Sequence, residues 1–220
     1  MLAAVSIGAP ALLETATHAA GAGATATGPQ WAFLIDLRRC DGCDHCTTAC
    51  QSAHYLSEEQ TWIKVYKLTN AAGLTLAMPR LCMHCENPPC VRVCPTQATW
   101  KREDGIVMMD WHRCIGCRYC MAGCPYGSRS FNWSDPRPAI RTITPDFPTR
   151  SKGVVEKCTF CEERLAKNQM PACVEACPDK AIVFGDVRDP GSEVRALLRS
   201  RLALRRKAEL GTGPAVYYIV

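Results

Sequence analysis

Sixteen cysteines in four groups of four constrain this 220-residue chain more than any other feature of its sequence. Every group begins with the spacing C-x2-C and ends with C-x3-C, and in three groups proline follows the last cysteine. Four copies of one spacing indicate one purpose for all sixteen thiols. Group I is Cys40, Cys43, Cys46 and Cys50; group II is Cys82, Cys85, Cys90 and Cys94; group III is Cys114, Cys117, Cys120 and Cys124; group IV is Cys158, Cys161, Cys173 and Cys177.

The spacing is one that cubane iron–sulfur clusters require. A C-x2-C-x2-C loop wraps three corners of a cubane, and the fourth thiolate, three residues further on, points away and reaches a neighbouring cluster. Group III, C-I-G-C-R-Y-C-M-A-G-C-P, is the bacterial ferredoxin run without a gap. Sixteen thiolates supply four ligands to each of four clusters with none left over. We therefore expect four [4Fe-4S] clusters.

Three other uses of the cysteines fit the pattern less well. Adjacent C-x2-C pairs have poor geometry for bridging one another, which argues against a disulfide framework. Structural zinc takes two C-x2-C pairs per site, which groups II and IV could offer but groups I and III could not. A Rieske centre needs two histidines in place of two cysteines. His45 and His84 lie inside groups I and II, but the thiols already complete the count, so we expect both imidazoles beside a cluster or in a loop.

Short apolar segments flank the groups in a regular order. Residues 32–36 and 105–110 are typical of strands that lead into groups I and III, and residues 97–100 and 180–185 of strands that follow groups II and IV. A two-cluster ferredoxin needs a strand of each kind. The simplest pairing of the four groups therefore places one pair of groups, II and III, within the other pair, I and IV. Groups II and III then form an inner ferredoxin-like unit, and groups I and IV an outer one. This predicts a loop-rich α+β fold with small antiparallel sheets.

The nesting assigns ligands, because the fourth cysteine of each group crosses to the cluster of the partner group. If Cys50 shared one cubane with Cys40, the crossover would be wrong. The expected sets are Cys40, Cys43, Cys46 and Cys177 for cluster 1; Cys158, Cys161, Cys173 and Cys50 for cluster 2; Cys82, Cys85, Cys90 and Cys124 for cluster 3; and Cys114, Cys117, Cys120 and Cys94 for cluster 4.

The same reasoning divides the chain into domains and insertions. The expected parts are a leader at residues 1–30, the outer unit at residues 31–81 and 152–191, the inner unit at residues 82–124, a Pro- and Arg-rich insertion at residues 125–151, and a C-terminal helix and tail at residues 192–220.

Three segments outside the groups carry local predictions. Alternation at residues 61–66 predicts a strand. The Pro- and Arg-rich insertion favours a docking surface for a partner subunit over a solvated loop. Residues 192–210 predict one basic helix, capped by Ser192 and ended at Gly211, with residues 214–220 as a final strand. The helix's basic face is either solvated or a contact for an acidic partner or anionic headgroups. The arginines scattered in the insertion are Arg129, Arg137, Arg141 and Arg150.

The leader bears on localisation. Residues 2–13 resemble the apolar part of a signal peptide and residues 20–22 its cleavage site, but no positive region precedes them. Either an upstream start carries a twin-arginine signal, or the leader is a disordered low-complexity segment. Because a cluster protein folds around its metal before export, we expect twin-arginine export to the outer face of the cytoplasmic membrane, with the cytoplasmic face as the alternative.

At residues 31–220 the cysteine order and two further strings carry a family resemblance. The strings C-M-H-C-E-N-P-P-C at residues 82–90 and C-I-G-C-R-Y-C at residues 114–120 resemble the four-cluster subunits of molybdopterin oxidoreductases. That family includes the electron-transfer subunits of dimethyl sulfoxide, polysulfide, tetrathionate and nitrate reductases and of some quinone-linked hydrogenases. Some members carry tryptophan where this chain has Cys117, with a three-iron cluster there, so the resemblance implies four [4Fe-4S] clusters.

The resemblance also implies partners and a direction. Cluster 1 would face a molybdopterin-type catalytic subunit, and cluster 4 an integral-membrane quinone or quinol subunit. Single electrons would pass between them through the other two clusters, with no bond chemistry by this chain. Residues that would raise a cluster potential are Lys101, Arg113 and Arg118, cations close to groups II and III.

Other function classes fit less well. The chain has no nucleophile elbow, P-loop or dinucleotide motif, and full thiolate ligation leaves no open iron site, so we expect no catalytic site, no direct small-molecule substrate and no nucleic-acid partner. A hydrogenase subunit and a free polyferredoxin remain alternatives. The formal charge of +5 becomes about −3 once four clusters, each about −2 with its thiolates, are counted. Apolar residues other than cysteine are few for the length, so folding is expected to depend on cluster insertion.

Overall fold

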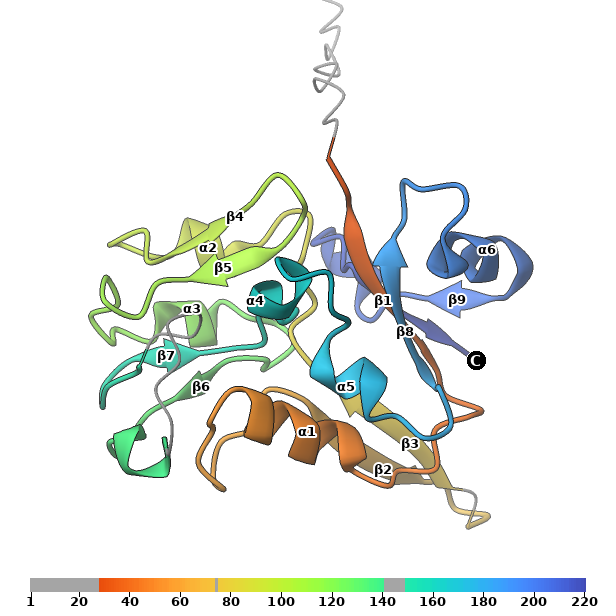
Figure 1. Cartoon of the computed structure of the whole chain (residues 1–220), viewed down its shortest axis with the longest axis horizontal. Helices are drawn as coiled ribbons and strands as arrows, with labels where there is room; N and C mark the ends of the chain where they lie inside the picture. Colours follow the sequence, from red (N-terminus) through yellow and green to blue (C-terminus); the bar gives the residue numbers. More distant parts are fainter. Residues whose placement is uncertain (1–27, 74, 141–148) are drawn as a thin grey trace, which may run out of the picture.

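A computed structural model describes residues 28–73, 75–140 and 149–220, so the expected leader lies almost wholly outside the described residues, as do Arg141 and its neighbours. The largest sheet has four strands in the order β8, β1, β10, β9 (Figure 1). β1 pairs with β8 in the antiparallel sense and with β10 in the parallel sense. The parallel pair corrects the expectation of small antiparallel sheets for this part of the fold. The strands are β1 (Trp31–Asp36), β8 (Ile182–Asp186), β10 (Val216–Ile219) and β9 (Ala203–Leu204).

Three further sheets are antiparallel strand pairs. β4, which follows group II, pairs with β5, which precedes group III. The strand expected at residues 61–66 begins later, because Trp62 and Ile63 are buried in the core before the chain becomes extended. The pairs are β2 (Lys64–Thr69) with β3 (Thr75–Arg80), β4 (Thr99–Lys101) with β5 (Val107–Met109), and β6 (Ser130–Phe131) with β7 (Val155–Glu156).

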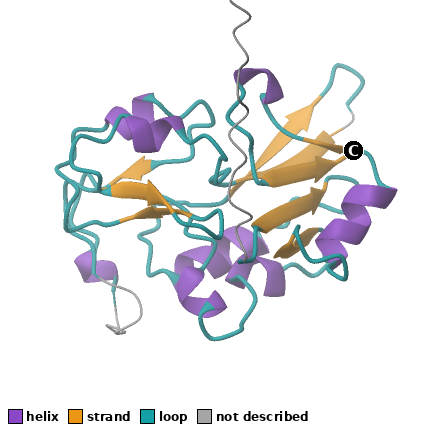
Figure 2. Ribbon diagram, turned by 90° about the horizontal axis from the view of Figure 1, so that it is seen from above, coloured by secondary structure: helices purple, strands orange, loops and turns teal. Residues whose placement is uncertain are grey.

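The helices are short, and most are attached to a cysteine group. α1 and α5 pack together although group I and group IV are far apart in sequence, and α2 packs on α3. Figure 2 shows how much of the chain between these elements is loop. The helices are α1 (His45–Ala53), α2 (Pro89–Arg92), α3 (Tyr119–Ala122), α4 (Glu162–Leu165), α5 (Ala172–Glu175) and α6 (Glu193–Ser200), with 3-10 turns η1 (Arg137–Ala139) and η2 (Ala208–Leu210).

The C-terminal segment is a helix followed by a returning strand, not one long helix. Ser192 caps α6 as expected, because its hydroxyl accepts a hydrogen bond from the Arg195 amide at 3.2 Å. The helix ends at Ser200, and the backbone of Arg201, the next residue, is extended. β9 then pairs with β10, so sheet hydrogen bonds replace the further helical turns that were expected. The predicted final strand is confirmed as β10.

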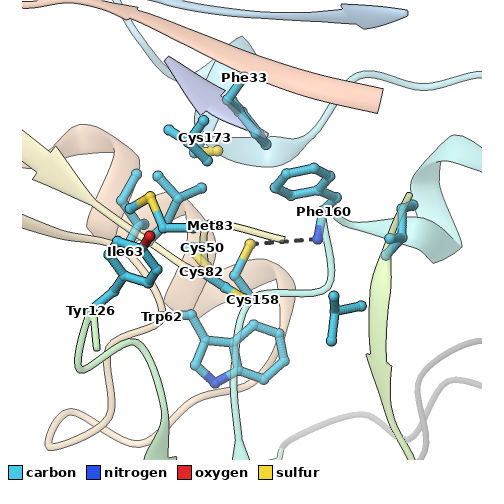
Figure 3. Close-up of a cluster of buried hydrophobic side chains, with 14 of the residues drawn as sticks. Phe33, Cys50, Trp62, Ile63, Cys82, Met83, Tyr126, Cys158, Phe160 and Cys173 are labelled. Carbon is cyan, nitrogen blue, oxygen red and sulfur yellow. Dashed lines mark hydrogen bonds between the residues drawn. The ribbon is translucent and has the colours of Figure 1, made fainter. Parts of the chain in front are cut away.

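The main core is built around sulfur. It packs aromatic and aliphatic side chains against cysteines of all four groups, and Figure 3 shows Cys50, Cys82, Cys158 and Cys173 in one region of it. A smaller core on the other face of the large sheet joins β1 to α6 through Leu34 and Val194. Among the described residues, no helix is long and apolar enough to cross a membrane.

Candidate iron–sulfur site

All sixteen cysteines lie within the described residues, and all are free thiols. Nine are buried and five half-buried, whereas Cys43 and Cys117 are exposed. In the described part of the chain, no two of the sixteen are joined by a disulfide bond. Burying many free thiols in a chain of this length is typical of metal ligation.

Cysteines of group I meet the last cysteine of group IV. Cys40, Cys43, Cys46 and Cys177 line one small cavity beside α1. Burial raises the pKa of Cys46 to about 12, with the neighbouring charges of Cys40 and Cys177 adding to it. Burial also raises the pKa of Cys40, and the charges of Cys177 and Cys43 add to the rise. Thiols gathered in this way need a cation among them before they can ionise together.

The last cysteine of group I lies with the other three cysteines of group IV. Burial raises the pKa of Cys158 well above its ordinary value, and the charges of Cys50 and Cys161 raise it further. The pKa of Cys173 is raised in the same way, by burial and then by Cys161, Cys50 and Cys158. Cys46 and Cys50, four residues apart on α1, thus have different principal sulfur neighbours.

Groups II and III are also interleaved. Burial raises the pKa of Cys85 to about 12, and its thiol neighbours are Cys82, Cys90 and Cys124. Cys120 lies near Cys114 of its own group and near Cys90. For Cys94 the sulfur is 3.7 Å from the Thr96 hydroxyl, and burial opposes but does not outweigh the hydrogen bonds that lower its pKa.

The ligand loops of groups I and III have the same backbone conformation. Gly42 and Gly116 have positive φ between the first two cysteines, and Asp44 and Arg118 both have φ 62° and ψ 7° where the helix begins. A left-handed bend at these points turns the chain around a common centre, which a wrapped loop requires. At Gly116 a Cβ atom would lie 2.2 Å from the Gly153 carbonyl oxygen, so this loop also needs glycine for close packing.

Backbone amides point at the sulfur atoms of group IV. Phe160 N–H donates to Cys158 Sγ at 3.4 Å, as Figure 3 shows, and Ala181 N–H donates to Cys177 Sγ at 3.2 Å. Such hydrogen bonds stabilise thiolates and help to set cluster potentials. Sulfur donors in quartets, wrapped loops and amides aimed at sulfur together fit [4Fe-4S] clusters.

Two buried cations lie near the thiols, although the sequence placed one of them, Arg129, in a docking surface and gave the other, Lys157, no role. Lys157 is 0% exposed and donates to the carbonyl oxygens of Val107 and Cys158. Arg129 is 6% exposed and donates to Thr99 Oγ1 at 2.9 Å. Because Lys157 directly precedes Cys158, the sequence could have indicated that it lies near a thiol. No nearby sequence feature indicates the same for Arg129.

Of the cations expected near the clusters, Arg113 and Arg118 are exposed and Lys101 is half-buried. Lys101 donates to the Glu86 carbonyl oxygen at 2.9 Å and Arg113 to that of Thr96 at 3.1 Å. Arg118 stacks over Trp133, with 5.0 Å between its guanidinium carbon and the ring centroid. Solvent screens charges in such positions.

The two histidines differ in environment. His45 is exposed at the start of α1. His84 is 1% exposed, accepts a hydrogen bond from Val107 N–H at 3.0 Å and donates through Nε2 to the Cys158 carbonyl oxygen at 3.0 Å. Burial, helped by the charge of Lys157, lowers the pKa of His84 well below its usual range. The ring is neutral and joins group II to group IV.

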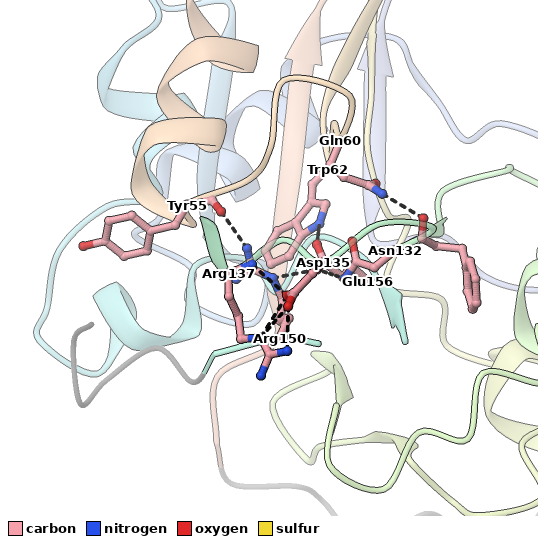
Figure 4. A network of polar contacts seen from close by, with 9 residues as sticks. Tyr55, Gln60, Trp62, Asn132, Asp135, Arg137, Arg150 and Glu156 are labelled. Atoms are coloured by element: carbon pink, nitrogen blue, oxygen red, sulfur yellow. Dashed lines mark hydrogen bonds and ion pairs between the residues drawn. The ribbon is translucent and has the colours of Figure 1, made fainter. Parts of the chain in front are cut away.

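The Pro- and Arg-rich insertion is anchored by a buried ion pair (Figure 4). Arg150 Nε lies 2.6 Å from Glu156 Oε1, and both side chains are almost completely buried. Trp62 Nε1 donates to the same carboxylate at 3.2 Å, and Asn132 donates to it as well. Of the arginines expected to form a docking surface, Arg150 and Arg129 are therefore interior residues, because their hydrogen-bond partners lie in the core.

Comparison with known proteins agrees with this chemistry. Residues 74–138 and 145–187 match a family described as a 4Fe-4S dicluster domain. The chain is 40% identical to the Hdr-like menaquinol oxidoreductase iron–sulfur subunit 1 of Archaeoglobus fulgidus, over 86% of this chain and 82% of that protein. It is 41% identical to the iron–sulfur cluster-binding subunit of menaquinone reductase from Nitratidesulfovibrio vulgaris, over 86% and 88% of the two chains. It is 42% identical to a subunit of tetrathionate reductase from Salmonella typhimurium, over 86% and 72%.

These likenesses define an electron-carrying subunit with thiolate-held clusters. The chain belongs to the family of 4Fe-4S dicluster iron–sulfur subunits of respiratory oxidoreductase complexes. The resemblance inferred from the cysteine strings is confirmed, and so is the expectation of an electron carrier within a complex.

Proposed function

We propose that this chain relays single electrons through four [4Fe-4S] clusters, between a molybdopterin-type catalytic subunit and a membrane quinone or quinol subunit. One observation carries the proposal. Among the sixteen cysteines, all within the described residues, Cys43 of group I and Cys117 of group III are exposed, while the thiols of groups II and IV are buried or half-buried. A relay needs two ends near the surface and an interior shielded from water, and this distribution supplies both.

Two nested ferredoxin-like units are the architecture we propose for the relay. Pairing of β1 with β8 and packing of α1 on α5 support an outer unit of groups I and IV. Pairing of β4 with β5 and packing of α2 on α3 support an inner unit of groups II and III. The division into residues 31–81 with 152–191 and residues 82–124 follows from these pairs.

The proposed ligand sets follow the crossover rule. The cavity shared by group I thiols and Cys177 supports cluster 1, and the neighbourhood of Cys50 and Cys158 supports cluster 2. The neighbourhood of Cys85 and Cys124 supports cluster 3. Cluster 4 would take the first three cysteines of group III together with Cys94.

The clusters, when bound, supply one-electron chemistry without bond making or breaking. The chain's own residues hold the clusters through thiolates, exclude water and aim backbone N–H groups at sulfur. Side chains such as Phe160 and Trp62 pack around the thiols and leave little room for solvent. A dry, rigid surrounding lowers the reorganisation that each electron transfer requires.

The two proposed ends differ in surface chemistry, which suits two different partners. Around Cys117, Ile115, Tyr119 and Trp133 are 66%, 63% and 65% exposed. Large exposed apolar side chains close to one another mark a protein contact, and we assign this contact to the membrane subunit. The end at Cys43 is bordered by aspartates, among them Asp179, and is assigned to the catalytic subunit.

Relatives that carry menaquinol oxidoreductase and menaquinone reductase in their names support a quinone partner. The tetrathionate reductase subunit, and a selenate reductase subunit from Mesobacillus selenatarsenatis that is 41% identical, support a catalytic partner that reduces an oxyanion or sulfur compound. We further propose that the complex lies on the outer face of the cytoplasmic membrane after twin-arginine export, with the cytoplasmic face as the alternative.

Copurification under anaerobic conditions tests the proposal. A tagged chain drawn from detergent-solubilised membranes of its source should bring with it a molybdopterin-containing subunit and a multi-span subunit, and should contain about sixteen iron atoms, four for each cubane. Tyr119→Lys should remove the membrane subunit and keep the catalytic one, and Asp179→Lys should do the reverse. If the chain purifies from the extract without any partner subunit, it is instead a free polyferredoxin. Nickel in the copurified subunit would indicate a hydrogenase.

A further inference from the structure

Three basic side chains are buried among the described residues. Arg150 and Lys157 are 1% and 0% exposed, and Arg129 is 6% exposed. Arg150 is paired with Glu156, the one buried carboxylate among the described residues. Among the described residues, Arg129 and Lys157 have no carboxylate partner. Their acceptors include a hydroxyl and a thioether for Arg129 and two carbonyl oxygens for Lys157.

A buried charge without a counter-charge is strongly unfavourable, because water no longer solvates it. Neutral hydrogen-bond acceptors offset only part of that cost. The two cations therefore need negative charge in their surroundings. The described residues offer no carboxylate to either of them within ion-pair distance, so the negative charge must come from the thiols.

The thiols near each cation belong to more than one group. Burial and the like charge of Arg129 lower the pKa of Lys157, and they are opposed by the charges of Cys82 and Cys90 of group II and of Cys158 of group IV. Those that act on Arg129 come from Cys90 and Cys82 of group II and from Cys120 of group III. A side-chain hydrogen bond to Cys90 also helps to raise the pKa of Arg129, and the charge of Arg129 opposes the rise that burial causes in the pKa of Cys120.

Group II is thus the set that both cations share. Lys157 lies on its group IV side and Arg129 on its group III side. Both are rigidly held: the Lys157 ammonium also binds the Val107 carbonyl on β5, and the Arg129 guanidinium is fixed by Thr99 on β4. Fixed positive charge in a low-dielectric interior acts strongly on nearby charge.

We propose that Arg129 and Lys157 are counter-charge residues that raise the reduction potential of cluster 3 above the potential it would have without them, so that the electron rests there during transfer. Reduction adds one electron and one negative charge to the thiolate-ligated cluster, with no bond made or broken. A nearby cation stabilises the more negative, reduced form and so raises the potential. This inference rests on the proposed ligand set of Cys82, Cys85, Cys90 and Cys124.

Redox titration followed by electron paramagnetic resonance tests this inference on the intact complex. In Arg129→Met and in Lys157→Met, one cluster signal should shift to lower potential, and it should be the same signal in both variants. Arg129→Lys keeps the charge, so its cluster potentials should stay close to those of the unsubstituted protein. The matched controls Lys101→Met and Arg113→Met remove surface cations near the same groups and should leave all potentials unchanged.

Several results would overturn the inference. These are no shift in either methionine variant, shifts of two different signals, or equal shifts in Arg129→Met and Arg129→Lys, which would indicate packing in place of charge. If Arg129→Met fails to bind clusters while Arg129→Lys binds them, charge is still the property required. If neither binds them, Arg129 acts through packing and the proposal is wrong.

The proposed function fails separately from this inference. Iron and sulfide analysis of the unsubstituted complex decides whether four clusters are present, before any variant is compared. If the complex holds four clusters and their potentials do not change when Arg129 or Lys157 is replaced, the inference is wrong but the proposed function stands.

Discussion

The imidazole Nε2 of His84 lies 3.0 Å from the carbonyl oxygen of Cys158, although 74 residues separate them in sequence. The same ring accepts the Val107 N–H on its other nitrogen, so a single neutral side chain ties group II to group IV and to β5. The buried ring also stacks on Phe160, with 3.6 Å between ring centroids. His84 is thus a structural bridge between ligand loops.

Replacing His84 by phenylalanine should keep the ring's packing and remove both hydrogen bonds. The Val107 N–H loses its His84 acceptor inside the core, which costs about 1–3 kcal/mol. We expect the temperature at which visible cluster absorption disappears to fall by several degrees. His45→Phe, at the exposed histidine of group I, should leave that temperature unchanged. Equal behaviour of the two variants would contradict a bridging role for His84.

The glycine in the group III loop offers a test of loop packing. Gly116 and Gly127 both have positive φ, but only a Cβ at Gly116 meets another atom, the Gly153 carbonyl oxygen at 2.2 Å, whereas Gly127 has nothing within 4 Å. Gly127→Ala should therefore cost about 1–2 kcal/mol, because a side chain is strained in left-handed backbone. Gly116→Ala should cost more and change the resonance signal of the group III cluster. A smaller effect at Gly116 would mean that the loop can move away from Gly153.

The crossover of ligands can be tested with pairs of cysteine substitutions. Cys43→Ala with Cys177→Ala should damage one cluster, because both thiols belong to the proposed cluster 1. Cys43→Ala with Cys50→Ala should damage two, although both residues belong to group I. Iron content and the number of remaining resonance signals distinguish these cases. If the second pair damaged one cluster and the first pair two, the ligands would follow the sequence groups.

The buried ion pair of Arg150 and Glu156 should stabilise the fold, because each charge is the counter-ion of the other. Glu156→Gln leaves the Arg150 charge buried without its counter-ion, and breaking such a pair costs about 3–5 kcal/mol. We expect a large drop in the thermal midpoint, measured by circular dichroism of the loaded protein. Asp135→Asn breaks the exposed pair with Arg137, which is 2.6 Å long, and should leave the midpoint unchanged because solvent screens it. A Glu156→Gln protein as stable as the unsubstituted one would contradict a stabilising role for the charge of Glu156.

Local elements were predictable where the determining interactions are local. The strand before group I, the Ser192 cap and the final strand each depend on neighbouring residues, and each is confirmed. The predicted tail helix was longer than the observed one, because the helical pattern could not reveal that residues after Arg201 would pair with β10. β6 and β7 were also missed, since two-residue strands carry no periodic signal.

Cysteine spacing by itself determined the cofactor class, because cubane ligation imposes a spacing within a few residues of chain. The same spacing together with the strings at residues 82–90 and 114–120 indicated the family. Only the tertiary structure decided which charges surround those thiols. Arg113 and Arg118 are close to ligands in sequence but exposed, and Lys101 is half-buried and bound to the Glu86 carbonyl oxygen. Arg129 and Lys157, which lie next to β6 and β7 in the chain, are instead buried near the thiols. Electrostatic effect depends on distance and burial in three dimensions, and sequence separation fixes neither.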